Sequence, residues 1–169
     1  PALASAQEAV ALYTHLANQC PAEFTGELAA AISNLGVAYG NAQQHDQALR
    51  CAQQTADIYR RLAAQQPDTY RSDLAMATTN LASAYSLLEQ YGPALDAARE
   101  TMAQYTLLAA QNPDRFNPPW ARSLGLLAHC HLGLQQLGPA RDHAHHGLRL
   151  LTPCFLQQPE LHSAALSVL

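Results

Sequence analysis

Apolar and small residues along the chain recur with the spacing of a helical face, in blocks separated by short polar stretches. In one block, Leu74, Thr78, Leu81 and Tyr85 are four, three and four residues apart, which places them on one face of a helix. A second run with helical spacing follows a Gly-Pro turn. Its members are Ala94, Leu95, Ala98, Met102 and Tyr105. The pattern predicts two amphipathic helices joined by a short turn.

This block recurs with a period of 46 residues. Residues 21–66 and 67–112 align without a gap and share 18 identities in 46 positions, and residues 113–158 are a weaker copy. Prolines keep the same period, at Pro21, Pro67, Pro113 and Pro159. A fixed period of this size is typical of a repeat array. We therefore interpret residues 1–169 as a single array with three full units.

The pattern also sets the expected bounds of the helices. Within the units we expect helices at about residues 26–42, 45–65, 71–89, 92–111, 118–136 and 138–152. Residues 1–20 match the second helix of a truncated unit, at about 2–19, and residues 159–169 match the start of a further helix. We expect turns around Pro67 and Pro113, and Pro118 and Pro119 suit a helix start. Neither end supplies a polar capping unit, so we expect a window from a longer array, or ends that pack on other domains or on further copies.

Alanine recurs where the paired helices should approach most closely. These residues are Ala48, Ala94 and Ala140 and, one turn later, Ala52, Ala98 and Ala144. A side chain larger than a methyl group would force the two backbones apart at such a crossing. Trp120 stands at the position of Leu74 and should be buried.

The residues that carry the repeat resemble a known family. Leu35-Gly36-x-x-Tyr39, followed by Ala48 and Ala52, resembles the tetratricopeptide repeat, whose usual unit is about 34 residues long. The longer unit, with Asn34 and Asn80 before the leucine, is similar to kinesin light chain and related bacterial arrays. The resemblance covers essentially the whole chain and implies an all-α, right-handed superhelix of antiparallel helix pairs. HEAT and armadillo arrays have a similar period, but the Leu-Gly-x-x-Tyr motif favours the tetratricopeptide repeat.

The sequence departs from this family at two kinds of position. Ile32, Thr78 and Leu124 stand where a tryptophan is common. His131 replaces the motif tyrosine in the third unit, so the packing of that unit is open to question.

The resemblance further implies that the first helix of each unit lines a concave groove. It assigns to the groove Ala30, Ser33, Val37 and Asn41, then Met76, Thr79, Ser83 and Leu87, then Arg122, Gly125 and His129. Asn34 and Asn80 either bond neighbouring backbone, holding the register between units, or contact a ligand. Arg122 offers a planar fork that suits a carboxylate. With His129 seven residues later, it could anchor an acidic residue or the C-terminus of a ligand, or both side chains could simply be solvated.

Composition narrows the function. The net charge of −4 and the pI near 6.0 leave no basic surface of the kind that nucleic acid requires. No stretch is long and apolar enough to span a membrane, and no secretory signal is visible. The four cysteines form no C-x-x-C pair, which indicates reduced thiols in a cytoplasmic protein. The abundance of Ala, Gln and Arg, with no Lys, suggests a bacterial genome.

Candidate chemistry is sparse. Five histidines gather in the third unit: His129, His131, His143, His145 and His146. Two of them, His143 and His146, share a helical face that could hold zinc, but no cysteine or carboxylate completes a familiar ligand set. No close pair of carboxylates and no nucleophile elbow is present. We therefore expect neither a cofactor nor an enzyme.

The sequence thus predicts a protein–protein interaction module. A peptide or a partner helix would bind in the concave groove. Three alternatives stay open: a regulatory sensor segment of a larger signalling protein, a histidine-based metal-binding protein, and self-association through the uncapped ends.

Overall fold

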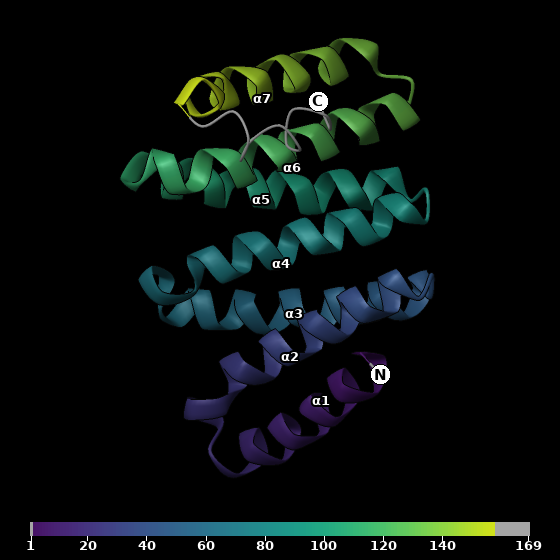
Figure 1. Cartoon of the computed structure of the whole chain (residues 1–169), viewed down its shortest axis with the longest axis vertical. Coiled ribbons are helices and arrows are strands. Elements are labelled where there is room, and N and C mark those ends of the chain that lie inside the picture. The colour runs from purple at the N-terminus through teal and green to yellow at the C-terminus, as the bar shows by residue number, and fades with distance from the viewer. Residues whose placement is uncertain (1, 158–169) are drawn as a thin grey trace.

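In the computed structural model, residues 2–157 are described, and they form a stack of seven α-helices (Figure 1). The helices are α1 (Ala2–Gln19), α2 (Pro21–Asn41), α3 (His45–Gln65), α4 (Pro67–Leu87), α5 (Tyr91–Gln111), α6 (Pro113–Gly133) and α7 (Leu137–Gln157). Each helix packs on the next one along the chain. The expected all-α solenoid is confirmed. The further helix expected within residues 159–169 lies outside the described residues.

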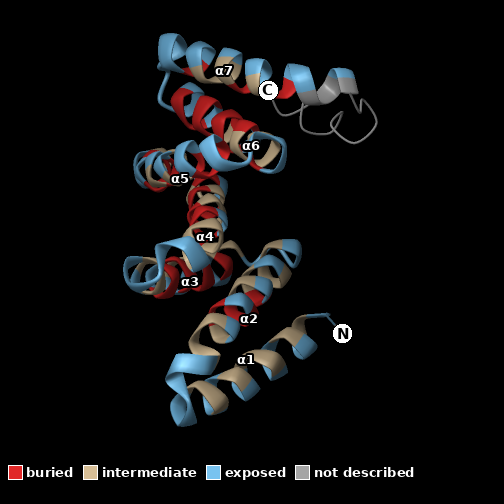
Figure 2. Cartoon of the chain, turned by 90° about the vertical axis from the view of Figure 1, so that its left-hand side faces the viewer, coloured by how far each residue is buried: buried red, intermediate tan, exposed pale blue. Residues whose placement is uncertain are grey.

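The helices form two layers. Figure 1 is viewed from the side of α2, α4 and α6, while α3 and α5 lie behind them. Turning the molecule shows α3 and α5 together on one side, with the buried residues concentrated where the two layers meet (Figure 2). Contacts between α4 and α6 join successive units within the front layer. No helix within residues 2–157 has both the length and the apolar character needed to cross a membrane.

The turn inside each helix pair is built without glycine or proline. Gln43, Glu89 and Gln135 occupy the same position in successive units and have φ values of 58°, 57° and 59°. The amide of the next residue donates back to the helix, for example from Gln90 N to the Tyr85 carbonyl oxygen at 2.9 Å. This left-handed closure ends the first helix. The expected Gly-Pro turn is therefore wrong, because Gly92 and Pro93 lie in the first turn of α5.

Between units the chain turns on a single residue. Cys20, Gln66 and Asn112 separate the helices, and a proline is the first helical residue after each of them. The first position of a helix needs no amide hydrogen, so proline is favoured there. The first helices consequently begin four or five residues earlier than the sequence pattern suggests, because the unit prolines start helices instead of forming turns.

Two other prolines correct the expected bounds of α6. Pro118 and Pro119 lie inside this helix and do not begin it. Each of them costs the helix one hydrogen bond that an amide would have donated. α7 similarly continues past residue 152 through Pro153 to Gln157.

Small residues line the helix crossings as expected. Ala94 and Ala98 are 0% and 1% exposed, and Ala48, Ala52 and Ala140 are also buried, whereas Ala144 is only half-buried. The helices of the first pair also approach closely at Gly36, where an added Cβ would stand 3.0 Å from Cys51 Cβ. In the next unit the same two positions hold Ala82 and Ala97. The side chain is thus larger on the first helix and smaller on the second, so the space between the helices stays filled.

A repeated hydrogen bond joins the second helix of one unit to the first helix of the next. Gln7 Nε2 donates to the Tyr39 hydroxyl at 3.2 Å, and 46 residues later Gln53 Nε2 donates to the Tyr85 hydroxyl at 2.9 Å. In the third unit, His131 is buried instead.

His131 Nδ1 lies 2.7 Å from Gln136 Oε1, and its ring stacks on His143 at 5.2 Å. The third unit therefore keeps the fold with a different polar contact. Trp120 is only half-buried, against the expectation of full burial, and lies edge-on to His146 at 5.2 Å.

Leu81 tests this core directly. It is 5% exposed in the central apolar cluster, and Leu81→Ala should lower the free energy of unfolding by about 2–5 kcal/mol, because the cavity it leaves cannot fully collapse. Leu107, which is 50% exposed on α5, provides the control. Leu107→Ala should change the same quantity by about 0.5 kcal/mol or less. Denaturant unfolding measures both, and equal effects would contradict this assignment of the core.

Candidate functional site

The front layer carries a hollow between α2, α4 and α6, here called the groove pocket. Its volume is about 420 Å³. Eight of the residues predicted for the groove line it: Ala30, Ser33, Asn34, Val37, Met76, Thr79, Asn80 and Arg122. A second hollow of about 340 Å³ opens between α2, α3 and α4 and is called the side pocket. It is lined by three further predicted residues, Asn41, Ser83 and Leu87, and shares Ser33, Val37 and Asn80 with the groove pocket.

Two residues expected in the groove lie elsewhere. His129 is exposed but lines neither pocket, and its ring lies edge-on to that of Tyr91 at 6.1 Å. Gly125 is buried and presents no groove surface. The third unit therefore reaches the groove pocket through Arg122 and Pro119 only.

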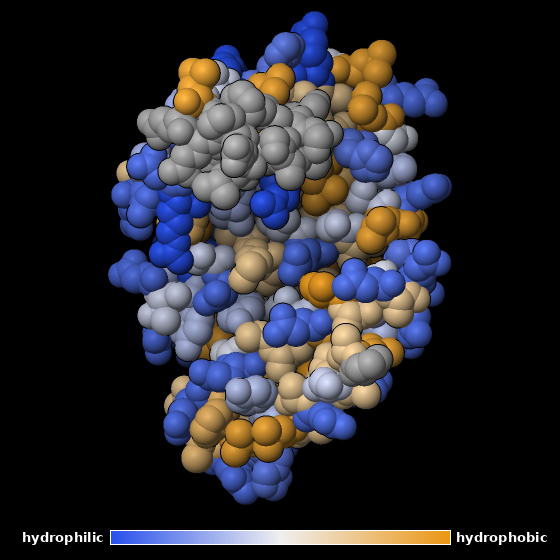
Figure 3. Space-filling model, viewed as in Figure 1, coloured by the Kyte–Doolittle hydropathy of each residue, from blue (hydrophilic) through white to orange (hydrophobic). Residues whose placement is uncertain are grey.

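Large apolar side chains are exposed along this surface. Val37, Met76 and Leu87 are 54%, 54% and 58% exposed. They belong to α2 and α4, whose outer faces turn toward the viewer in Figure 3, where apolar and polar side chains alternate over the front of the molecule. A surface of this kind offers apolar area for burial while its polar rim keeps it in contact with water.

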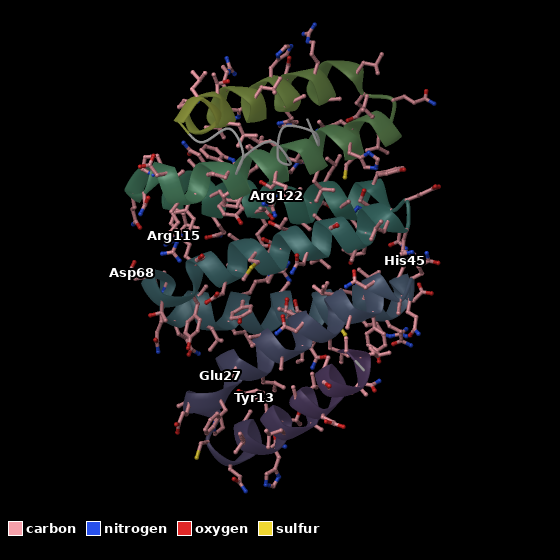
Figure 4. The ribbon with its side chains drawn as sticks, in the orientation of Figure 1. Tyr13, Glu27, His45, Asp68, Arg115 and Arg122 are labelled. Carbon is pink, nitrogen blue, oxygen red and sulfur yellow. The ribbon has the colours of Figure 1, made fainter. Side chains whose placement is uncertain are left out.

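Arg122 is an unpaired cation at this surface. It lies near the middle of the stack in Figure 4, on α6. Its side chain is exposed and makes no salt bridge within residues 2–157. The pKa of Tyr105, which also lines the groove pocket, is raised by burial, and the positive charge of Arg122 partly opposes that rise. The guanidinium is therefore available to an anionic group of a ligand.

Asp73 lines the same pocket and was not singled out from the sequence. Burial raises the pKa of its carboxyl, and this side chain makes no salt bridge within the described part of the chain. The pKa of Tyr59 is raised to about 12, mainly by burial of its hydroxyl and then by the negative charge of Asp73. Asp73 lies three residues before Met76, on the groove face of α4. This spacing could have identified Asp73 as a groove residue from the sequence.

The polar groups of the pocket are partly engaged within the protein. Asn80 Nδ2 donates to Ser33 Oγ at 3.3 Å, which joins α4 to α2. Asn80 thus holds the register between units, but through a side chain and not through backbone. Thr79 Oγ1 donates to the Ala75 carbonyl oxygen at 2.7 Å. Asn34 is exposed at the rim.

Four of the five histidines of the third unit pack against other rings, and His145 is exposed. His143 stacks on His131, His146 contacts Trp120, and burial lowers the pKa of both His143 and His146. No group of three His, Cys, Asp or Glu side chains within residues 2–157 gathers closely enough to hold a metal ion.

Comparison with known proteins agrees with this architecture. Residues 28–68 match the model of the tetratricopeptide repeat. In fold the chain is similar to the crystal structure of BtubC (BKLC) from P. vanneervenii, a kinesin light chain-like tetratricopeptide protein, with a TM-score of 0.67 and 20% sequence identity. The likeness covers 99% of this chain and 61% of that one, so the chain spans about three fifths of its structural relative. No curated protein matches the chain in sequence.

These comparisons confirm the resemblance to the tetratricopeptide repeat and to its kinesin light chain-like form. Tetratricopeptide repeats in general form non-catalytic scaffolds that mediate protein–protein interactions.

Asp73 should destabilise the free protein at neutral pH. Its carboxyl has a higher pKa when folded than the ordinary 3.8, so the folded chain binds the proton more tightly and stability falls as pH rises through that interval. Asp73→Asn should therefore raise the melting temperature at neutral pH, and this gain should disappear below pH 3.8.

The control is Asp96→Asn, which removes an exposed carboxylate that pairs with Arg99 on the surface of α5. Thermal melts of both variants across this pH range provide the measurement. A gain for Asp73→Asn that persists at low pH would show that the effect does not arise from the charge.

Proposed function

We propose that the chain is a protein-interaction module that captures an extended peptide or a partner helix along α2, α4 and α6. The observation that carries this proposal is the groove pocket itself. It combines exposed apolar side chains with two opposite charges, Arg122 and Asp73, neither of which makes a salt bridge within residues 2–157. Half-buried carboxylates without a partner reduce stability, so a ligand that supplies the partner would recover part of the loss.

Affinity would come mainly from the apolar residues. Val37, Met76 and Leu87 are more than half exposed in the free protein, and burial of apolar surface is the main favourable term in most protein association. The gain is reduced by the freedom that a flexible ligand loses on binding.

Orientation would come from the polar groups. Arg122 presents several donors in one plane and suits a carboxylate, whether a side chain or a C-terminus. Asp73 suits a basic or amide group on the same ligand. Asn34 and the carbonyl oxygen of the Asn80 side chain supply neutral contacts to a peptide backbone. The ligand favoured by this arrangement is a segment with mixed charges and apolar residues between them.

Other features fit a cytoplasmic binding module better than an enzyme. The helix pairs α2–α3, α4–α5 and α6–α7 support a division into units 21–66, 67–112 and 113–158, with α1 before the first pair. Cys20, Cys51 and Cys130 are free thiols, which supports a reducing compartment. α1 has no fully buried residue, which supports packing of its open face on another domain or another copy.

Selection from a displayed library of random peptides tests the proposal. The wild-type chain should enrich peptides that carry an acidic residue or a C-terminal carboxylate next to apolar residues. Arg122→Glu should weaken the binding of these peptides by at least about tenfold, because it replaces attraction by repulsion at a close charge pair.

Arg61→Glu is the matched control for this charge reversal. Arg61 lies on α3, away from both pockets, and its Nε donates to the Asp57 carbonyl oxygen of its own helix. The Arg61→Glu variant should bind the selected peptides with the same affinity as the wild type. Failure to enrich any peptide, or equal binding by all three proteins, would contradict the proposal.

A further inference from the structure

The contact between α6 and α7 contains a pair of imidazole rings that the earlier helix pairs lack. His131 and His143 stand where the second unit has Tyr85 and Ala97. His131 is 8% exposed, and its ring stacks on that of His143, with the ring centres 5.2 Å apart and the planes 14° apart. Two titratable rings have thus replaced a phenol and a methyl group where the two helices meet.

His131 also holds the turn that leads into α7. Its Nδ1 lies 2.7 Å from Oε1 of Gln136, and the Gln136 amide donates to the His131 carbonyl oxygen at 2.8 Å. Because a carbonyl oxygen only accepts, Nδ1 carries the proton of the neutral ring, and a second proton would bind at Nε2. Protonation of His131 therefore keeps this hydrogen bond but places a positive charge beside His143.

The same two helices make a second contact through a histidine. His146 of α7, one turn after His143, meets Trp120 of α6 edge-on at 5.2 Å. α7 packs on α6 and lies at the end of the stack (Figure 1). In an array whose units contact mainly their neighbours, a terminal helix can separate while the remaining helices stay packed.

The charges around the stacked pair do not favour a second proton. No histidine forms a salt bridge within residues 2–157. The negative charge of Asp142 raises the pKa of His143, but its carboxylate lies 3.4 Å from the guanidinium of Arg141. The charges of His131 and His146 act in the opposite direction and lower the pKa of His143.

The other charged groups of the neighbouring helices supply no free anion. On α5, Arg99 occupies the position from which Gln53 reaches Tyr85, and it pairs with Asp96 at 2.8 Å. On α7, the positive charge of Arg149 lowers the pKa of His146.

Burial is the largest cause that lowers the pKa of both His143 and His146 from the ordinary 6.5. The packed helices therefore bind protons less tightly than the separated helices. The stability of the α6–α7 contact is consequently full above pH 6.5 and falls as the pH drops through the lowered pKa values.

We propose that the α6–α7 contact is a proton-operated switch, in which protonation of the stacked His131 and His143 rings separates α7 from α6 while α1 to α6 stay packed. Two positive rings 5.2 Å apart repel each other. Each proton bound on opening raises the ratio of separated to packed α7 by up to about tenfold per pH unit. Separation uncovers Leu151 of α7, which is 0% exposed in the packed form. The switch needs no ligand and does not rest on peptide capture.

Trp120 is the only tryptophan of the chain, and its fluorescence reports on this contact. As the pH of the full chain falls from about 8 to about 5, its emission maximum should move to longer wavelength. Quenching by acrylamide, which is neutral and insensitive to protein charge, should become at least about twofold faster, because local opening admits the quencher. Both changes should reverse at neutral pH. Unchanged emission and quenching over this range would overturn the proposal.

Two variants assign the response to the stacked rings. The double variant His131→Tyr with His143→Ala copies the corresponding residues of the second unit, keeps His146, and should abolish the response. His143→Gln removes one titratable ring with little change in size and should shift the midpoint to lower pH. An unchanged response in either folded variant would overturn the assignment.

His15→Gln is the matched control, because His15 is an exposed histidine on α1. It should respond to pH as the wild type does, and loss of the response in this variant would contradict the assignment. Amide NMR spectra then distinguish local opening from global unfolding. In acid, signals of α7 should lose their dispersion while those of α3 and α4 keep theirs. Simultaneous loss of dispersion in all helices would overturn a local switch.

Discussion

The close approach of helices at small residues is the constraint on which the rest of the structure depends. Where Gly36 faces Cys51 and where Ala94 and Ala98 are fully buried, no larger side chain fits between the backbones. Small residues at these positions let the helices of a pair approach closely, and each helix then packs on the next. This stacking brings α2, α4 and α6 to one side of the molecule and leaves their outer faces free of internal packing.

The binding features lie where the units depart from one another. The scaffold repeats its tyrosine contact from Gln7 and Gln53, and then replaces it with His131 in the third unit without loss of the fold. In the groove pocket these departures leave two charged side chains, Arg122 and Asp73, without a salt bridge within residues 2–157.

Sequence periodicity predicted the helix pairs, because a helical repeat fixes which positions share a face, and the family resemblance pointed to many of the residues that line the two pockets. It misplaced the turns, since the left-handed residues are Gln43, Glu89 and Gln135 and not glycine, and since the unit prolines start helices. Asp73 was missed because a pattern of residue types does not show that its carboxylate is partly buried in a pocket. The side pocket depends on packing distances between three helices, which no pattern of residue types determines.

The central claim is that the front layer is the surface that a protein ligand contacts. The most direct measurement is a crystal structure of the chain with its tightest selected peptide. The account predicts the peptide along α2, α4 and α6, with an acidic group at Arg122 and apolar side chains over Val37 and Met76. A peptide seated on the rear layer of α3 and α5, or at the open ends of the stack, would contradict it.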